Sequence, residues 1–154
     1  MCRLRFLPRA SALAAASAAM LTVAACASSV PPDEFRRTEQ KLEAARIVAS
    51  LSCSTPRDCD TRWTQTRDFI DRHSATRVES ADASTIETGE PHQYGVASLR
   101  AERTVSDGVT IIRLKGICRG MYDTDGGPGP LYRECAQRLY DAALDFRRSV
   151  GAAQ

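Results

Sequence analysis

The dipeptide Asp107-Gly108 stands between two runs of β-forming residues, and it constrains the fold more than any other stretch of the chain. An Asp-Gly pair in this setting indicates a two-residue hairpin turn, because the central positions of such a turn need a positive φ. The two runs, residues 94–106 and 109–118, are therefore predicted to form an antiparallel pair of strands.

The turn also fixes which residues stand opposite one another. One face receives three small or apolar pairs, which are Ala101 with Leu114, Leu99 with Gly116, and Ala97 with Cys118. The other face pairs Glu102 with Arg113 and Arg100 with Lys115. A shift of one residue would set Glu102 against Ile112 and mix the two faces. The first face is expected to be buried, with Arg103 near the hairpin end reaching out to solvent.

A C-terminal helix is predicted over about residues 130–150. Pro130 suits its first position and Gly151 its end. Its apolar residues form one stripe at helical spacing, which consists of Leu131, Cys135, Leu139, Ala142, Phe146 and Val150. Cys135 lies on this stripe and Cys118 on the apolar face of the hairpin. Two independent periodicities thus bring the same two sulfur atoms into one core.

The remaining elements are two helices and two short strands. The helices are expected over residues 33–51 and residues 61–73, the second capped by Asp60 after a turn at residues 54–60. The inner face of the second helix would carry Trp63, Thr66, Ile70 and His73, with Phe69 beside it. The strands are expected at residues 76–80 and 84–88. The sequence therefore predicts an α+β fold with two helices, a four-stranded antiparallel sheet, and a disulfide-tied C-terminal helix packed on one sheet face.

The first 26 residues have the three parts of an export signal. Arg3, Arg5 and Arg9 form a positive segment without acids, and residues 10–23 form an uncharged apolar run. That run is shorter than the ~20 residues that a membrane-spanning helix needs. Small residues then lead to Cys26, and the pattern resembles the lipobox of bacterial lipoproteins. In that family a peptidase cuts before a cysteine that carries diacylglycerol. The alternative is an ordinary secretory signal that leaves Cys26 free.

The lipoprotein resemblance implies a domain plan and a location. Residues 1–25 would be the signal peptide, residues 26–32 a lipidated tether, and residues 33–154 a single periplasmic domain. In the family the cysteine carries diacylglycerol and palmitate. Their acyl chains would anchor Cys26 in the membrane, because each buried CH₂ adds about 0.8 kcal/mol to the free energy of membrane binding. The residue after Cys26 is Ala rather than Asp. In the family's sorting pattern this implies the outer membrane, with the domain on its periplasmic face.

Removal of the signal changes the charge of the chain. Its three Arg leave 18 basic against 19 acidic residues, so the formal charge falls from +2 to −1. Binding to nucleic acid through its phosphates depends on a basic excess. Nucleic acid is therefore not expected as a partner.

Four cysteines follow residue 26, namely Cys53, Cys59, Cys118 and Cys135. An even number in an exported chain indicates disulfides, for which three connectivities are open. We expect Cys53–Cys59 and Cys118–Cys135. Zinc is the other reading, but five residues separate Cys53 from Cys59 where a zinc site has two to four. His73 and His92 also lie far from any cysteine in the sequence, so no metal is expected.

The predicted layout is similar to that of small, mostly uncharacterised proteobacterial envelope proteins. The residues that match are Trp63, the strand at 85–88, Cys118, Cys135 and Phe146. In those proteins a Trp-bearing helix precedes a four-stranded meander and a terminal helix tied by cysteines. The resemblance implies no established activity.

Two groups of residues have the types that bind metal or catalyse reactions. Asp123, Asp125 and Glu134 stand at positions 1, 3 and 12 of a calcium-type loop. Gly127 and Pro128 stand where such a loop needs a ligand and a glycine, so we expect a solvated turn. The second group, which has the residue types of a catalytic triad, consists of Asp71, His73, Ser74 and His92. No nucleophile motif or glycine-rich phosphate loop accompanies it, so neither an enzyme nor a cofactor is expected.

These observations favour a lipid-anchored, non-catalytic envelope protein that acts as an interaction or assembly module for another envelope protein. Two surfaces could bind this partner: the outer sheet face around Arg100, Arg113 and Lys115, and the loop at Met121 and Tyr122. The alternative function is the binding of a small apolar ligand, such as a lipid, between sheet and helices. Its cavity would be lined by Leu99, Ile112, Leu114, Leu139 and Phe146.

Overall fold

The Asp107-Gly108 turn forms as predicted in a computed structural model, which describes residues 30–151. The two residues have φ values of 52° and 77°, and all five predicted strand pairs stand opposite one another. The signal peptide at residues 1–25, Cys26 and most of the expected tether lie outside the described residues.

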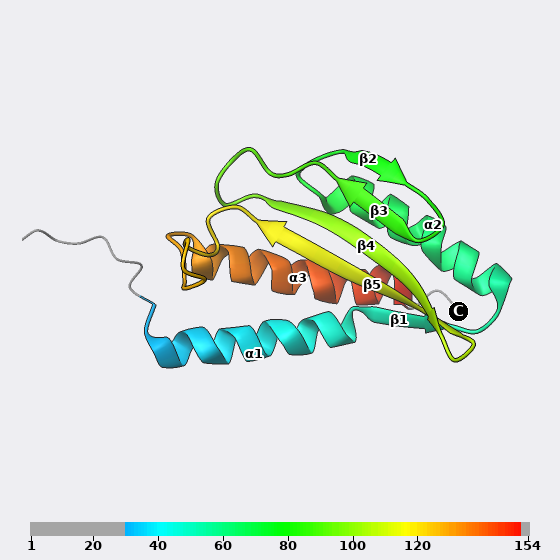
Figure 1. Ribbon diagram of the computed structural model, residues 1–154, viewed down its shortest axis with the longest axis horizontal. Coiled ribbons are helices and arrows are strands. Elements are labelled where there is room, and N and C mark those ends of the chain that lie inside the picture. The colour runs from blue at the N-terminus through cyan, green and yellow to red at the C-terminus, as the bar shows by residue number, and fades with distance from the viewer. Residues whose placement is uncertain (1–29, 152–154) are drawn as a thin grey trace, which may run out of the picture.

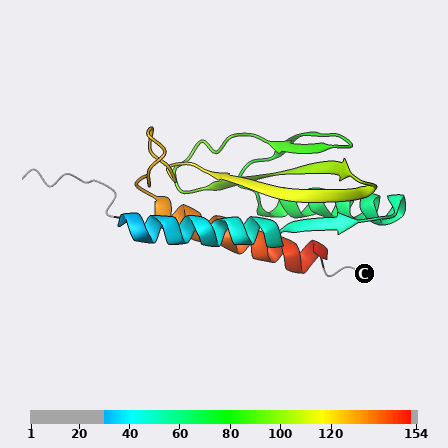
Figure 2. The same cartoon turned by 60° about the horizontal axis from the view of Figure 1, so that its bottom comes forward.

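The described chain is an α+β domain with three helices and one five-stranded antiparallel sheet. In sequence order its elements are α1 (Pro32–Val48), β1 (Ser50–Cys53), α2 (Pro56–His73), β2 (Val78–Ala81), β3 (Thr85–Thr88), β4 (Ala97–Ser106), β5 (Val109–Cys118) and α3 (Tyr132–Gly151). The strands are arranged in the order β1-β5-β4-β3-β2 (Figure 1). The helices lie on one side of the sheet, as Figure 2 shows.

The prediction of four strands is wrong by one, because the first helix ends at Val48 and Ser50–Cys53 form β1. In β1 the buried residues are Leu51 and Cys53, which alternate with exposed Ser52. Leu51 stands opposite Ile112 of β5. Pairing with the edge of β5 thus decides the structure of Ser50 and Leu51, which the prediction places at the end of the helix.

The second helix begins at Pro56, five residues before the predicted start, so the expected turn at residues 54–60 is mostly helix. Thr55 caps it, accepting a hydrogen bond from the backbone N–H of Asp58 at 3.3 Å. Pro56 occupies the first turn, where its missing N–H has no partner to lose. Asp60, the expected cap, instead forms an ion pair with Arg103 at 2.9 Å. Arg103 therefore binds α2 rather than reaching into solvent.

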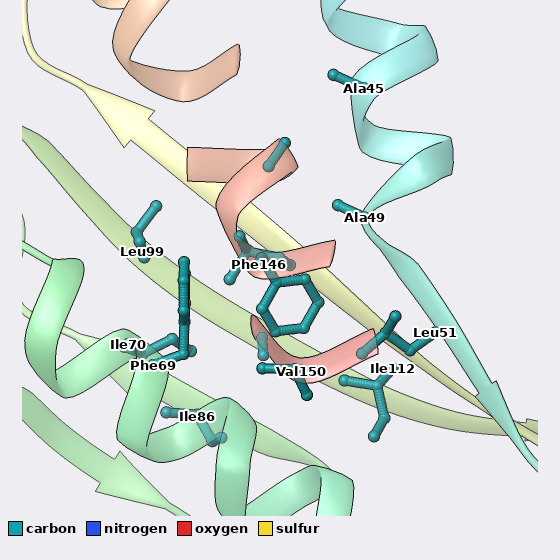
Figure 3. Packing of buried hydrophobic residues seen from close by; sticks show 13 residues of the cluster. Ala45, Ala49, Leu51, Phe69, Ile70, Ile86, Leu99, Ile112, Phe146 and Val150 are labelled. Carbon is teal, nitrogen blue, oxygen red and sulfur yellow. The ribbon is translucent and has the colours of Figure 1, made fainter. Parts of the chain in front are cut away.

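The main core lies between the inner face of the sheet and the three helices. It combines Phe69 of α2 and Phe146 of α3, whose rings meet edge to face with centroids 5.3 Å apart (Figure 3). Ile86, Leu99 and Ile112 supply the sheet side and are buried. Of the residues predicted for the inner face of α2, Thr66 and Ile70 are buried, Trp63 is partly buried and His73 is exposed.

A second core cluster surrounds the disulfide between Cys118 and Cys135. The other disulfide joins Cys53 to Cys59, so the predicted pairing is confirmed. Buried Tyr132 lies in the second cluster, and its ring contacts Phe35 of α1 at 5.0 Å between centroids. The start of α1 is thus packed against the start of α3.

Candidate interaction surface

The outer sheet face consists of the β4 and β5 side chains that point away from the helices. Its members are Ser98, Arg100, Glu102, Thr104 and Ser106 of β4, and Val109, Ile111, Arg113, Lys115 and Ile117 of β5, of which Ser98 is buried. Among residues 30–151 no helix packs on this face, because the helices share the opposite side (Figure 2). The predicted basic residues Arg100, Arg113 and Lys115 therefore lie together on an uncovered surface.

The charges of this face are only partly balanced. Lys115 forms an ion pair with Glu102, diagonally across the strands rather than directly opposite. The same hydrogen bond from Lys115 lowers the pKa of Glu102 below its ordinary value. Arg113 donates to the hydroxyl of Thr104 at 3.1 Å and has no carboxylate partner in the described chain. Exposed charge pairs are worth little, so these cations remain able to exchange partners.

Arg100 differs from the other two basic residues because it is half-buried. Its Nε is shielded from solvent and makes no hydrogen bond within residues 30–151. A buried donor without an acceptor costs about 1–3 kcal/mol. An acceptor placed against this face would remove that cost.

Exposed apolar side chains accompany the charges. Ile117 is 42% exposed and Val109 is 40% exposed, and both lie on β5. The sequence carries a signal for these exposed residues, because residues 109–118 alternate between the two faces and have apolar side chains on both. Arg is enriched at protein interfaces whereas Lys is depleted, so Arg100 and Arg113 are the residues of this face that most resemble interface residues.

The loop after β5 does not present both predicted contact residues. Met121 is 1% exposed and belongs to the second core cluster, so its proposed place on a partner surface is wrong. Tyr122 is 42% exposed, and its hydroxyl donates to Glu39 of α1 at 3.0 Å. Glu39 also accepts from Tyr132 at 2.8 Å, and burial with this hydrogen bond raises the pKa of Tyr132. The loop is thus tied to α1 through one carboxylate.

The calcium-type residues are engaged in local contacts. Asp123 accepts hydrogen bonds from the backbone N–H groups of Asp125 and Gly127, at 3.0 and 2.6 Å, and so closes its own turn. Glu134 forms an ion pair with Arg138. Within the described residues no group of three or more metal-binding side chains is assembled.

The triad-type residues do not form a nucleophile and base pair in the described chain. Ser74 accepts a hydrogen bond from the backbone N–H of Leu99 at 3.0 Å. The His73 ring stacks on Phe69, and its Nδ1 lies 2.9 Å from the carbonyl oxygen of the same residue. His73 and Ser74 line an open groove of about 360 Å³ together with Leu99 and Ala142. Their hydrogen bonds are made to the backbone of Phe69 in α2 and of Leu99 in β4. His92 is exposed, and its backbone carbonyl accepts a hydrogen bond from Arg119.

The residues expected to line an apolar cavity fill the core instead. Leu99, Ile112 and Phe146 are at most 2% exposed. Figure 3 shows them among the other side chains of the core. The space beside Leu99, Leu114 and Leu139 measures about 30 Å³. Ligand pockets typically measure ~300–1,000 Å³, so this space suits a water molecule or two.

Comparisons of the chain with protein families, with curated proteins and with solved structures find no match. Among residues 30–151, no helix has the length and apolar character that crossing a membrane requires.

Proposed function

We propose that the protein is a lipid-anchored, non-catalytic component of the bacterial envelope whose outer sheet face binds another protein. The observation that carries the proposal is the uncovered face with three basic residues and exposed Ile117 and Val109. Burying such a face against a partner would remove apolar surface from water and supply acceptors to Arg100 and Arg113.

The anchor is proposed from the N-terminal residues. A positive segment, an apolar run and Cys26 follow one another in the order of a lipoprotein signal. Two disulfides suit an oxidising compartment such as the periplasm. Since α1 begins at Pro32, only five residues separate it from Cys26, so the domain would be held close to the outer membrane.

The anchor is tested by the intact mass of the protein extracted from membranes, measured before and after reduction. We expect cleavage before Cys26, added mass of acyl chains and two disulfides. A Cys26→Ser variant should leave the membrane fraction, whereas Cys2→Ser, which changes a cysteine inside the signal, should not. A full-length chain without acyl mass contradicts the proposal.

The partner face is tested by photo-crosslinking in cells. A photoreactive residue placed at Ile117 of β5 should form covalent adducts with another envelope protein. The same residue at Gln137, exposed on α3, is the matched control and should form none. Adducts from Gln137 alone would place the interface on the helical side and contradict the proposal.

A further inference from the structure

The edge of β5 is only partly occupied. β4 pairs with β5 along Val109–Cys118, whereas β1 pairs only with Thr110, Ile111, Ile112 and Arg113 on the other edge. The second half of β5, residues 114–118, therefore has no strand neighbour on that edge within the described chain. Figure 1 shows α1 ending where β1 begins, so β1 accompanies only the first half of β5.

The hairpin turn determines which backbone groups face this open edge. In a two-residue turn the flanking residues, Ser106 and Val109, form a hydrogen-bonded pair. Hydrogen-bonded and non-hydrogen-bonded pairs then alternate along the ladder, so Arg113, Lys115 and Ile117 bond to β4. Leu114 and Gly116 direct their N–H and C=O groups to the open edge.

Gly116 lies on this open edge and is exposed although it is inside a long strand. A Cβ at this position would lie 2.5 Å from Leu139 Cδ2, so α3 packs directly against the inner face of β5 here. Unpaired donors and acceptors on an exposed edge are a template for another strand.

α1 supplies the second wall of a groove along this edge. A space of about 200 Å³ is lined by Glu43, Arg46, Ile47, Ser50, Arg113, Leu114 and Lys115. The space of about 30 Å³ at Leu42, Gly116 and Leu139 shares Arg46, Leu114 and Lys115 with it and lies next to it along β5, so the groove narrows there. Ile47 is 66% exposed in the first space, where an incoming apolar side chain could cover it.

The charges around the groove select the occupant. Arg113 has no carboxylate within ion-pair distance in the described chain, whereas Lys115 is paired with partly buried Glu102 and Arg46 with exposed Glu43. Arg113 and Lys115 lie on the outer side of the sheet, and Leu114 and Leu42 lie toward the core. Since side chains of a strand alternate between faces, an added strand would place acidic residues outward and aliphatic residues inward.

We propose that the open edge of β5, between α1 and Lys115, binds an extended segment of the partner protein as an added strand with alternating acidic and aliphatic residues. This inference rests on the proposed function, for which it names the mode of binding. The main-chain hydrogen bonds supply affinity, and the alternation supplies specificity.

The proposal is tested with the full-length, disulfide-bonded protein and a fluorescent peptide of alternating Asp and Val, by fluorescence anisotropy. Arg113→Glu should weaken binding about tenfold or more, because it replaces attraction by repulsion. Arg57→Glu makes the same change at an exposed site on α2 and should leave binding unchanged. Circular dichroism of the two variants verifies that they fold.

Methylation of the peptide backbone separates strand addition from simple charge attraction. Alternate amides of an added strand point toward β5, and the others point away from it. Methylation of the first set should abolish binding, and methylation of the second set should have no effect. Equal effects in both phases, or equal binding of a Lys-Val peptide, overturn the proposal. Sedimentation that shows a dimer lost in Arg113→Glu also overturns it, because a second copy would then occupy the edge. If Ile117 still crosslinks a partner while the peptide fails to bind, the proposed function stands and this inference falls.

Discussion

At the scale of single residues, Asp82 organises the connection between β2 and β3. Its Oδ1 accepts hydrogen bonds from the backbone N–H groups of Ser84 and Thr85, at 2.7 and 2.8 Å. These bonds favour the ionised carboxylate and lower the pKa of Asp82 from 3.8 to about 2. The backbone carbonyl of the same residue accepts from Trp63 Nε1 at 2.8 Å, which ties the connection to α2.

Asp82→Ala should lower the Tm near neutral pH. The pKa is depressed in the folded state, so the stabilisation is present above the ordinary value of 3.8 and is lost as pH falls through about 2. Thermal melts over this range should show the difference between variant and parent shrinking with falling pH. Asp71→Ala, at an exposed site on α2, is the control and should show little difference. A difference for Asp82→Ala that does not change with pH contradicts the argument.

Gly116 is required by close packing rather than by its backbone angles. Besides the 2.5 Å approach to Leu139, an added Cβ would lie 3.2 Å from Leu99 Cδ2. We expect Gly116→Ala to lower the free energy of unfolding by about 1–3 kcal/mol, measured by chemical denaturation. Leu139→Ala removes the nearest atom, so the double variant should lose less than the sum of the two single losses. Additive losses would show that the clash with Leu139 is not the cause.

At the scale of elements, α2 begins five residues earlier in the chain than the sequence predicts. Thr55 and Pro56 form a regular helix start, but Asp60 offers an equally good cap in the sequence. The disulfide between Cys53 and Cys59 favours the earlier start, because it places the first turn of α2 against the end of β1. The disulfide expected from the sequence is thus consistent with a helix that begins before Cys59.

Thr55→Ala should lower the free energy of unfolding by about 1 kcal/mol, the usual cost of losing a helix cap. Thr64 lies exposed within α2 and bonds only to the carbonyl of Asp60. Thr64→Ala should therefore leave stability unchanged or raise it, since Ala favours helix. Urea denaturation of the two variants measures both effects. Equal losses at the two positions would mean that Thr55 is not the cap.

At the scale of the whole molecule, the two disulfides fasten the sheet to different helices. Cys53–Cys59 joins β1 to α2 across a separation of 6 residues, and Cys118–Cys135 joins β5 to α3 across 17. The second bond closes the loop that carries Met121 and the contacts to α1. The two covalent ties thus lie toward opposite ends of β5, because Cys118 is its last residue and Cys53 stands opposite Thr110.

Replacing both cysteines of a pair by Ala should destabilise the domain in the order of loop length. The chain-entropy relation gives about 3 kcal/mol for Cys118–Cys135 and about 2 kcal/mol for Cys53–Cys59. Denaturation of the two double variants, compared with the oxidised parent, measures the difference. The reverse order would show that native packing at Cys53, rather than loop closure, dominates.

The sequence by itself determined the hairpin register and the C-terminal helix, because each follows from a local turn or from a periodicity. The two periodicities also favoured Cys118–Cys135 among three open connectivities, which leaves Cys53 to pair with Cys59. It also placed Arg100, Arg113 and Lys115 on one face. Arg113 and Lys115 are two apart in one strand and share a face, and the turn sets Arg100 opposite Lys115. Only the tertiary structure decided that Ser50–Cys53 form a strand, that Met121 is buried and that half of the β5 edge stays open. These features depend on which distant segments meet, and no local pattern records that.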